Sequence, residues 1–201
     1  MKLHWSPKSP YVRKVMILIE ELHAAKDIEL VRSVAAMTQP NKALMVDNPL
    51  SKIPTLVLSD GTKLFDSVVI CEYLNDLYKG ALFPSGQNEK WQALRWHALG
   101  DGLLDALILW RNERERVVPL DSLMAAFELK VMATLDVLEK EVEAIRSSGF
   151  TIGIVAVVCA LGYLDYRFEA LGWRSKASKL AEWYAAIEKR PSVQNTLPVE
   201  G

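Results

Sequence analysis

Hydrophobic and polar residues alternate with a strand-like period only in the first third of the chain, and elsewhere they follow a helical period. Residues 2–5, "KLHW", alternate polar and apolar, which predicts a short strand with one buried face. From Tyr11 to about His23, apolar residues recur every three or four positions, which predicts a helix with one apolar stripe. A second strand is predicted over 28–31.

The stretch "NPLSKIPTLVLSDGTKLF" (48–65) predicts a β-hairpin. Its parts are a strand over 55–58, an Asp-Gly turn and a short returning strand. Apolar residues then recur with helical spacing between 68 and 77. The polar pair Asp66-Ser67 stands where the N-cap of that helix is expected.

The predicted elements divide into an α/β domain and an all-α domain. Residues 1–79 read β-α-β followed by β-β-α, and a linker rich in Gly, Pro and polar residues is expected at 80–87. Residues 88–201 are predicted to form an all-helical domain, with its last helix ended by Pro191. Its helices are predicted near 88–116, 121–147, 151–171 and 175–189.

The charge balance argues against a partner that is held by net charge. The chain has 24 basic and 25 acidic side chains, so we expect neither a nucleic acid nor an acidic membrane as partner, and a small neutral or zwitterionic ligand fits better. Its start lacks the long apolar core of a secretory signal, and no window approaches the roughly 18–20 apolar residues of a membrane span. We therefore expect a cytoplasmic protein.

Cysteine and histidine spacing predicts no metal site. Cys71 and Cys159 lie in apolar helical patterns and form neither a CxxC pair nor a metal-ligand cluster, so both are expected to be buried free thiols. The three histidines, His4, His23 and His97, have no metal-ligand spacing and are interpreted as structural or exposed.

Three segments resemble parts of one enzyme family. They are "SPKSPYVRKV" near the N-terminus, "NPLSKIPTLVLSDGTKLFDSVVICEYL", and the weaker marker "ALGYLDYRF" (160–168). Together they span nearly the whole chain, which resembles a cytosolic glutathione transferase of the serine-type, bacterial-like kind. The resemblance implies an α/β thioredoxin-like N-terminal domain followed by an all-α domain, glutathione as co-substrate, and a homodimer.

Ser9 has two compatible interpretations. As the N-cap of the first helix its oxygen would accept a backbone N–H, a contact that stabilises by about 1 kcal/mol. Its own proton stays available, and it lies at the positive end of the helix dipole. The resemblance implies that Ser9 donates to the glutathione sulfur, which favours the nucleophilic thiolate over a thiol of pKa about 8.5. Ser6 also precedes a proline and is the second candidate donor.

The resemblance also assigns groups to the rest of glutathione. Pro54 is expected to follow a cis peptide bond and Ile53 to pair its backbone with the cysteinyl part, although residue pattern alone favours a proline that opens an edge strand. Asp66 would face the glutamyl ammonium, and Ser67 with its helix N-terminus the glutamyl carboxylate, although the pair also fits an ordinary helix cap. Candidates for the glycyl carboxylate are Lys52, Lys42 and, more weakly, Gln39.

The second substrate is expected between the two domains, over the sulfur. The candidate lining residues come from the start of the first domain and from the helix predicted over 88–116. They are Trp5, Tyr11, Asp101, Leu104 and Ile108. Most apolar residues at helical spacing belong to a core, which is the competing interpretation. The run "RNERER" (111–116) is interpreted as a solvated helix end rather than a substrate clamp.

One position departs from the family pattern. Thr151 opens a helical segment, but position 154 is Ile where the family has the Asp of a capping box. Thr151 is still expected to cap a first-turn N–H, with Phe150 and Val155 as a hydrophobic staple. The missing carboxylate predicts a deficit on the order of 1 kcal/mol, so that Ile154→Asp would raise the melting temperature.

The sequence therefore predicts a transferase that conjugates the glutathione thiolate to an electrophilic small molecule, as in detoxification. A glutathione-dependent isomerase or peroxidase would use the same site and stays an alternative. A thiol-disulfide oxidoreductase is disfavoured because it needs a cysteine where Ser9 stands. A non-catalytic binding module is the alternative from another class.

Overall fold

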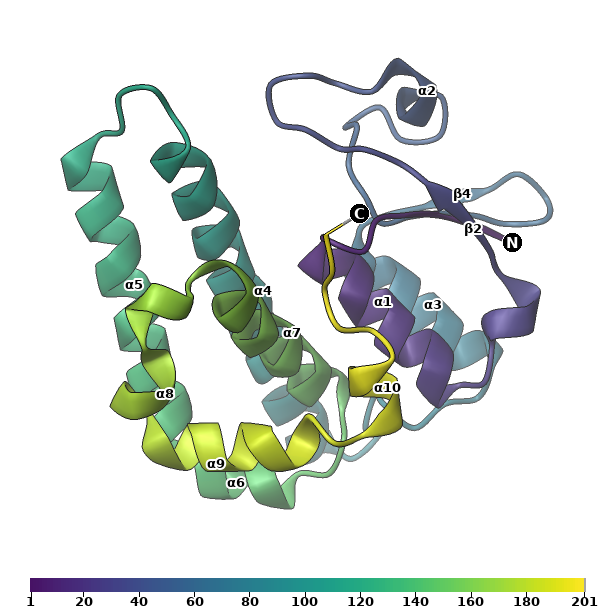
Figure 1. Cartoon of the computed structure of the whole chain (residues 1–201). Helices are drawn as coiled ribbons and strands as arrows, with labels where there is room; N and C mark the ends of the chain where they lie inside the picture. Colours follow the sequence, from purple (N-terminus) through teal and green to yellow (C-terminus); the bar gives the residue numbers. More distant parts are fainter. Residues whose placement is uncertain (201) are drawn as a thin grey trace. The chain divides into compact units, whose positions relative to one another are not determined.

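The structure is a computed structural model, and it describes residues 1–200 (Figure 1). Contacts group the chain into two compact units. One contains residues 1–83 together with the C-terminal segment that begins at Pro191, and the other contains residues 84–190. The predicted fold class is confirmed, because the first unit carries a sheet with helices and the second is helical.

Within the described residues the first unit contains one four-stranded mixed sheet in the order β2-β1-β3-β4. The central strand β1 pairs in parallel with β2 and antiparallel with β3, and β3 pairs antiparallel with β4. The first predicted strand is thus an inner strand, and it is buried on both faces, at Leu3 and at His4, rather than on the one face that its alternation predicted. The strands are β1 (Lys2–Trp5), β2 (Glu29–Arg32), β3 (Thr55–Val57) and β4 (Lys63–Leu64).

Helices cover both faces of this sheet. Helices α1 (Pro10–Glu21) and α3 (Ser67–Leu77) lie side by side on one face, and the four-residue α2 (Lys42–Met45) lies on the other (Figure 1). Successive side chains of a strand point to opposite faces, so Leu3 and His4 of β1 face different layers. A 3-10 turn at Ala25–Asp27 connects α1 to β2.

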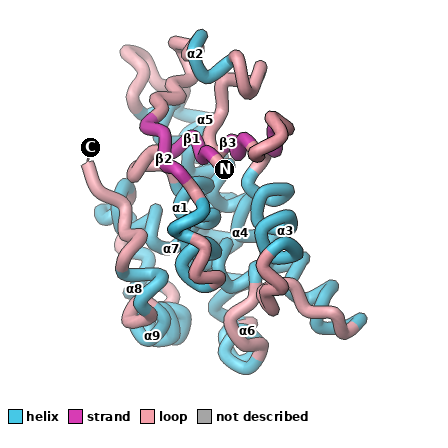
Figure 2. Tube along the Cα trace, turned by 90° about the vertical axis from the view of Figure 1, so that its right-hand side faces the viewer, coloured by secondary structure: helices cyan, strands magenta, loops and turns pink. Residues whose placement is uncertain are grey.

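The second unit consists of helices and loops throughout, whereas the strands gather in one sheet (Figure 2). Its central helix is buried along nearly its whole length and packs mainly against the longest helix. Its elements are α4 (Gln87–Arg114), α5 (Asp121–Lys140), α6 (Val142–Ser147), α7 (Ile152–Arg167), a 3-10 turn (Glu169–Leu171), α8 (Trp173–Lys176) and α9 (Ser178–Ile187).

The predicted helices of this unit are divided more often than their periodicity suggested. The helix expected over 121–147 breaks at Glu141, whose backbone leaves the helical conformation with φ −95° and ψ 4°. The helix expected over 175–189 is likewise two helices, α8 and α9. Pro191 does not simply follow the last helix, because it begins α10 (Pro191–Gln194), which contacts α1 in the first unit.

The start of α7 corrects one expectation. Thr151 occupies the N-cap position, but its side chain makes no capping hydrogen bond, and its buried hydroxyl has no partner among residues 1–200. Ile154 is 1% exposed. Removing a buried Ile side chain costs about 2–5 kcal/mol, which exceeds the roughly 1 kcal/mol of a cap. The stabilisation predicted for Ile154→Asp is therefore no longer expected.

Two further findings concern the whole described chain. Cys71 and Cys159 are both buried, as predicted, and neither forms a disulfide within residues 1–200. A search of residues 1–200 finds no helix with the length and apolar character that crossing a membrane requires.

Candidate functional site

The sheet topology brings three predicted site segments to one edge. Strand β1 ends at Trp5, and the loop that follows carries Ser9. Strand β3 runs antiparallel to β1, with His4 opposite Thr55, so its first residues lie beside the end of β1. Strand β4 runs antiparallel to β3, and the chain therefore leaves it at the same edge, just before α3. The segments that contain Ser9, Pro54 and Asp66 thus share one edge of the sheet.

Ser9 is the N-cap of α1, as predicted. Its backbone is extended, its Oγ accepts the N–H of Val12 at 3.3 Å, and Pro10 follows at the first helical position. The Ser9 side chain donates to no residue within 1–200, so its hydroxyl hydrogen remains available. Ser6 lies outside the helix, where its Oγ accepts the N–H of Lys8 at 3.4 Å.

The Ile53-Pro54 peptide bond is cis, as the resemblance implied. Pro54 is buried and directly precedes β3. Among residues 1–200, the backbone N–H and C=O of Ile53 have no hydrogen-bond partner. This half-buried residue therefore presents an unused donor and acceptor at the sheet edge.

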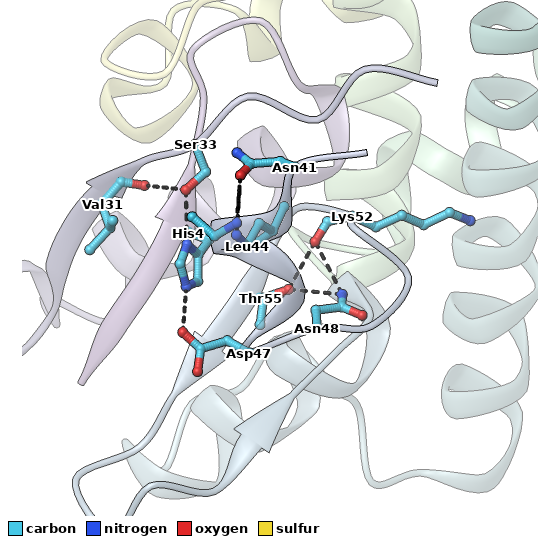
Figure 3. Close-up of polar contacts among 10 residues, drawn as sticks. His4, Val31, Ser33, Asn41, Leu44, Asp47, Asn48, Lys52 and Thr55 are labelled. Atoms are coloured by element: carbon cyan, nitrogen blue, oxygen red, sulfur yellow. Dashed lines mark hydrogen bonds and ion pairs between the residues drawn. The ribbon is translucent and has the colours of Figure 1, made fainter. Parts of the chain in front are cut away.

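A polar cluster fixes the segment that leads to Pro54 (Figure 3). The side-chain amide of Asn48 donates to the carbonyl of Lys52 at 3.1 Å and to the Thr55 hydroxyl at 2.9 Å, and that hydroxyl donates to the same carbonyl at 2.9 Å. The Lys52 side chain extends away from this cluster and is exposed (Figure 3). The backbone before Ile53 is thus held by side chains from both of its flanks.

Asp66 and Ser67 form the start of α3. Asp66 is the N-cap, and its Oδ1 accepts the N–H of Val68 at 2.9 Å. The cap interpretation of this pair is therefore correct, and it leaves the second carboxylate oxygen unused. Ser67 is 2% exposed, and its hydroxyl has no hydrogen-bond partner among residues 1–200. The first turn of α3 therefore presents a carboxylate oxygen, a hydroxyl and helix N–H groups.

The remaining candidates for binding glutathione lie between β2 and β3, on residues 33–54, called the α2 segment below. Lys42 is the exposed first residue of α2, and Asn41 caps that helix by accepting the N–H groups of Ala43 and Leu44. Gln39 is exposed and forms an isolated bridge with Ala36.

The acceptor candidates belong to different units. In the first unit, Trp5 ends β1 with the Arg32 guanidinium 5.7 Å from its ring centroid, and Tyr11 is half-buried in the first turn of α1. In the second unit, Asp101, Leu104 and Ile108 lie on α4, where Leu104 is fully buried.

The run at the end of α4 differs from its interpretation as a solvated helix end. Arg111 is half-buried and donates to the Tyr163 hydroxyl at 3.3 Å. Glu113 is buried and accepts the N–H of Leu120 at 2.8 Å. These residues therefore hold the end of α4 within the helical unit.

Two parts of the chain match descriptions of one protein family. Residues 8–77 match the family description "Glutathione S-transferase, N-terminal domain", and residues 121–186 match "Glutathione S-transferase, C-terminal domain". The chain belongs to the glutathione S-transferase family.

Relatives of this transferase-family chain extend over its full length. It is 31% identical to the uncharacterized GST-like protein YibF of Escherichia coli K12 over 98% of both chains. A crystal structure of a glutathione transferase family member from Pseudomonas fluorescens Pf-5 with bound glutathione is 40% identical, with a TM-score of 0.95 and 99% coverage of both chains. A second structure from that strain, with bound S-(propanoic acid)-glutathione, is 38% identical with a TM-score of 0.90 over 100% of both chains.

Sequence patterns do not reveal the polar residues that hold the segment between β2 and β3, namely His4, Asn48 and Thr55. The sequence indicates only a structural or exposed role for His4, and it assigns no role to Asn48 and Thr55. The partners of His4 are distant in the sequence, with Ser33 29 residues away and Asp47 43 residues away, so no local pattern indicates them. Asn48 and Thr55 contact near neighbours, but no periodicity or cap motif marks a polar residue in an irregular loop. Within residues 1–200, no cluster of acidic, histidine or cysteine side chains has the arrangement of a metal site.

Proposed function

We propose that the protein is a glutathione transferase that binds glutathione on its first unit and joins the glutathione sulfur to an electrophilic small molecule. Ser9 carries the proposal. It caps a 12-residue helix through its oxygen while its hydroxyl hydrogen finds no acceptor among residues 1–200. A sulfur placed beside Ser9 would accept that hydrogen at the positive end of the helix dipole, which favours the thiolate.

Unused polar groups at the same sheet edge match the rest of glutathione. The backbone of Ile53 would pair with the cysteinyl amide groups as a strand does. Asp66 would face the glutamyl ammonium, while Ser67 and the N–H groups of α3 would bind the glutamyl carboxylate. Lys52 and Lys42 are exposed and would reach the glycyl carboxylate.

The proposed step is a nucleophilic substitution or addition. The thiol releases its proton to solvent as the thiolate forms, and the sulfur electron pair then makes a carbon–sulfur bond. With an aryl halide, the halide leaves with the electrons of the carbon–halogen bond. Ser9 keeps its own proton throughout and acts only as a donor.

A related structure supports a site that has space for a substituent on the glutathione sulfur. The Pseudomonas fluorescens structure with S-(propanoic acid)-glutathione contains a glutathione whose sulfur carries a carbon chain. We infer that this protein accommodates a substituted sulfur as well, with Trp5 and Tyr11 of its first unit against the substituent.

The test is the thiol titration of bound glutathione, followed by the thiolate absorbance, in wild type and Ser9→Ala. We expect a lowered thiol pKa in wild type only, and a loss of about 100-fold in kcat/KM toward a generic aryl halide in Ser9→Ala, the scale of removing one preorganised donor. Ser6→Ala is the matched control and should keep wild-type rates. Equal titrations in wild type and Ser9→Ala would refute the role of Ser9.

Binding and conjugation separate the other functions. Retention on immobilised glutathione without conjugation of any aryl halide would favour a binding module. Turnover of a hydroperoxide or an isomerisable substrate without net conjugation would favour the peroxidase or isomerase alternative.

We also infer a homodimer that joins α3 of one copy to α4 and α5 of the next. The support is that each of these helices leaves large apolar side chains exposed, which a partner copy would cover. They are Val69, Leu77, Trp91 and Leu129. Light scattering should give twice the 22.6 kDa of the chain.

A further inference from the structure

The sheet face beneath α2 is held by polar contacts rather than by an apolar core. The buried side chains of this layer are mostly polar, namely His4, Ser33, Asn48 and Thr55, with Leu44 as the apolar member from α2. The larger apolar side chains of the same segment are exposed, namely Val34, Met37, Met45, Val46 and Leu50. Hydrophobic burial therefore does little to fix this segment, and its hydrogen bonds decide where it lies.

His4 contacts the α2 segment at two points, at its first residue and just after α2 (Figure 3). From the central strand, its Nδ1 lies 2.8 Å from the hydroxyl of Ser33, the residue that follows β2. Its Nε2 lies 3.0 Å from the carboxylate of Asp47, which follows α2. The His4 ring thus connects the residues on either side of α2, Ser33 and Asp47, to the sheet.

The contact between His4 and Asp47 is connected through the backbone to the residues that precede the proposed glutathione site. Asp47 is followed directly by Asn48, whose amide fixes the Lys52 carbonyl and the Thr55 hydroxyl. Thr55 is in turn the register partner of His4 on β3. The contacts of His4 and Asn48 therefore enclose the segment that presents the unpaired backbone of Ile53.

Ser33, His4 and Asp47 are also the residue types of a hydrolytic triad. The geometry argues against that activity. Ser33 is 6% exposed, and its hydroxyl also lies 3.3 Å from the carbonyl of Val31, to which it can donate. A nucleophilic serine needs access to a substrate carbonyl, which a buried hydroxyl lacks.

We propose that His4, acting through Asp47 and Ser33, is a positioning residue for glutathione. It touches no part of the proposed ligand. It holds the α2 segment so that Ile53 meets the cysteinyl backbone already in place, which reduces the ordering that binding requires. The proposal rests on the proposed function and adds to it the part of the chain that sets glutathione affinity.

The expected signature is a change in binding without a change in chemistry. Loosening the segment should raise the glutathione Kd and KM about tenfold, while kcat at saturating glutathione stays within about twofold, since Ser9 and α1 are untouched. A merely structural role would instead lower stability and leave the Kd of the folded protein unchanged.

The experiment compares Asp47→Ala, Asp47→Asn and the control Asp76→Ala in the full-length protein. Asp47 is partly exposed, so its replacement should leave the fold intact, and Asn can still accept the His4 Nε2–H. Asp76 is an exposed carboxylate on α3 outside the cluster. Titration calorimetry with glutathione, steady-state kinetics and hydrogen exchange of amides 41–54 are measured for each.

We expect Asp47→Ala to weaken glutathione binding and to speed exchange over 41–54, Asp47→Asn to recover most of both, and Asp76→Ala to match wild type. If wild type and Asp47→Ala bind glutathione with the same Kd, the positioning role is overturned and the proposed function still stands. A wild type that binds no glutathione would overturn the proposed function itself. Labelling of Ser33 by a fluorophosphonate probe would also overturn the positioning role, since it would show a reactive serine there.

Discussion

At the scale of single residues, the proposed activation of glutathione by Ser9 has the right size. A hydrogen bond to a charged group contributes about 1.5–3 kcal/mol, and a helix N-terminus about 0.3–1 kcal/mol. Together they amount to roughly 1.3–3 pKa units, which would bring a thiol from about 8.5 to between about 5.5 and 7.2. One hydroxyl at a helix start would therefore raise the thiolate fraction at neutral pH from a few per cent to between roughly two-fifths and nearly all of the bound thiol.

Glu141 lies at the break between α5 and α6, and its carboxylate is held by two donors from α4. Its carboxylate accepts the indole N–H of Trp96 at 2.7 Å and pairs with Arg95. The hydrogen bond from Arg95 lowers the pKa of Glu141, assisted by the one from Trp96. A depressed carboxyl pKa stabilises the folded state above the unfolded-state pKa and loses that contribution as the pH falls through the folded-state pKa.

We therefore expect Glu141→Gln to be less stable than wild type at neutral pH, and the difference to shrink as the pH falls below about 4. Urea unfolding at several pH values measures both. Glu143→Gln on α6, where the carboxylate is 79% exposed, is the control and should stay close to wild type throughout. A Glu141→Gln difference that does not depend on pH would contradict the electrostatic explanation.

At the scale of elements, α4 and α7 pack closely because two glycines leave room. A Cβ at Gly100 would lie 2.7 Å from the backbone carbon of Ala156 and 2.9 Å from the backbone nitrogen of Val157. A Cβ at Gly153 would likewise meet the carbonyl of Ala93. Both contacts are with backbone, so neither can be relieved by a side-chain rotation.

Gly100→Ala should therefore destabilise the protein by about 1–3 kcal/mol, the range of overpacked cores. Gly102→Ala is a matched control on the same helix, because its Cβ would meet nothing within 4 Å. It should stabilise by about 0.5–1 kcal/mol through the better helix propensity of Ala. Thermal unfolding compares the two, and equal effects would show that α4 can move away from α7.

Local patterns predicted the elements and their starts but not the contacts that join them. The range 2–5 predicted for the first strand coincides with β1, and Ser9 and Asp66 are predictable as caps because a cap acts on its own helix. At the break between α5 and α6, Glu141 accepts a hydrogen bond from Trp96, 45 positions away, and no periodicity indicates such a partner. The contacts of His4 with Ser33 and Asp47 are hidden for the same reason, since they span 29 and 43 positions.

At the scale of the whole molecule, the first unit is built from both ends of the chain. After the helical unit the chain returns to α1, where α10 packs and where Val193 is fully buried. The buried guanidinium of Arg13 donates to the Val193 carbonyl at 3.2 Å, and the Ser192 hydroxyl donates to Glu21. The helix that carries Ser9 is therefore anchored at its far side by the last residues of the sequence.

A chain that ends at Arg190 should lose this anchor. It would leave Arg13 buried without its carbonyl partner and expose the site of Val193, losses of about 1–3 kcal/mol each, which correspond to several degrees in the melting temperature of a chain of this size. A chain that ends at Thr196 is the control, because it keeps α10 and removes the exposed residues Leu197 and Val199. It also removes the pair between Lys8 and Glu200, but an exposed ion pair contributes little. Calorimetry should therefore show a lowered transition only for the chain that ends at Arg190, and equal transitions in both would mean that α1 is held without the C-terminal segment.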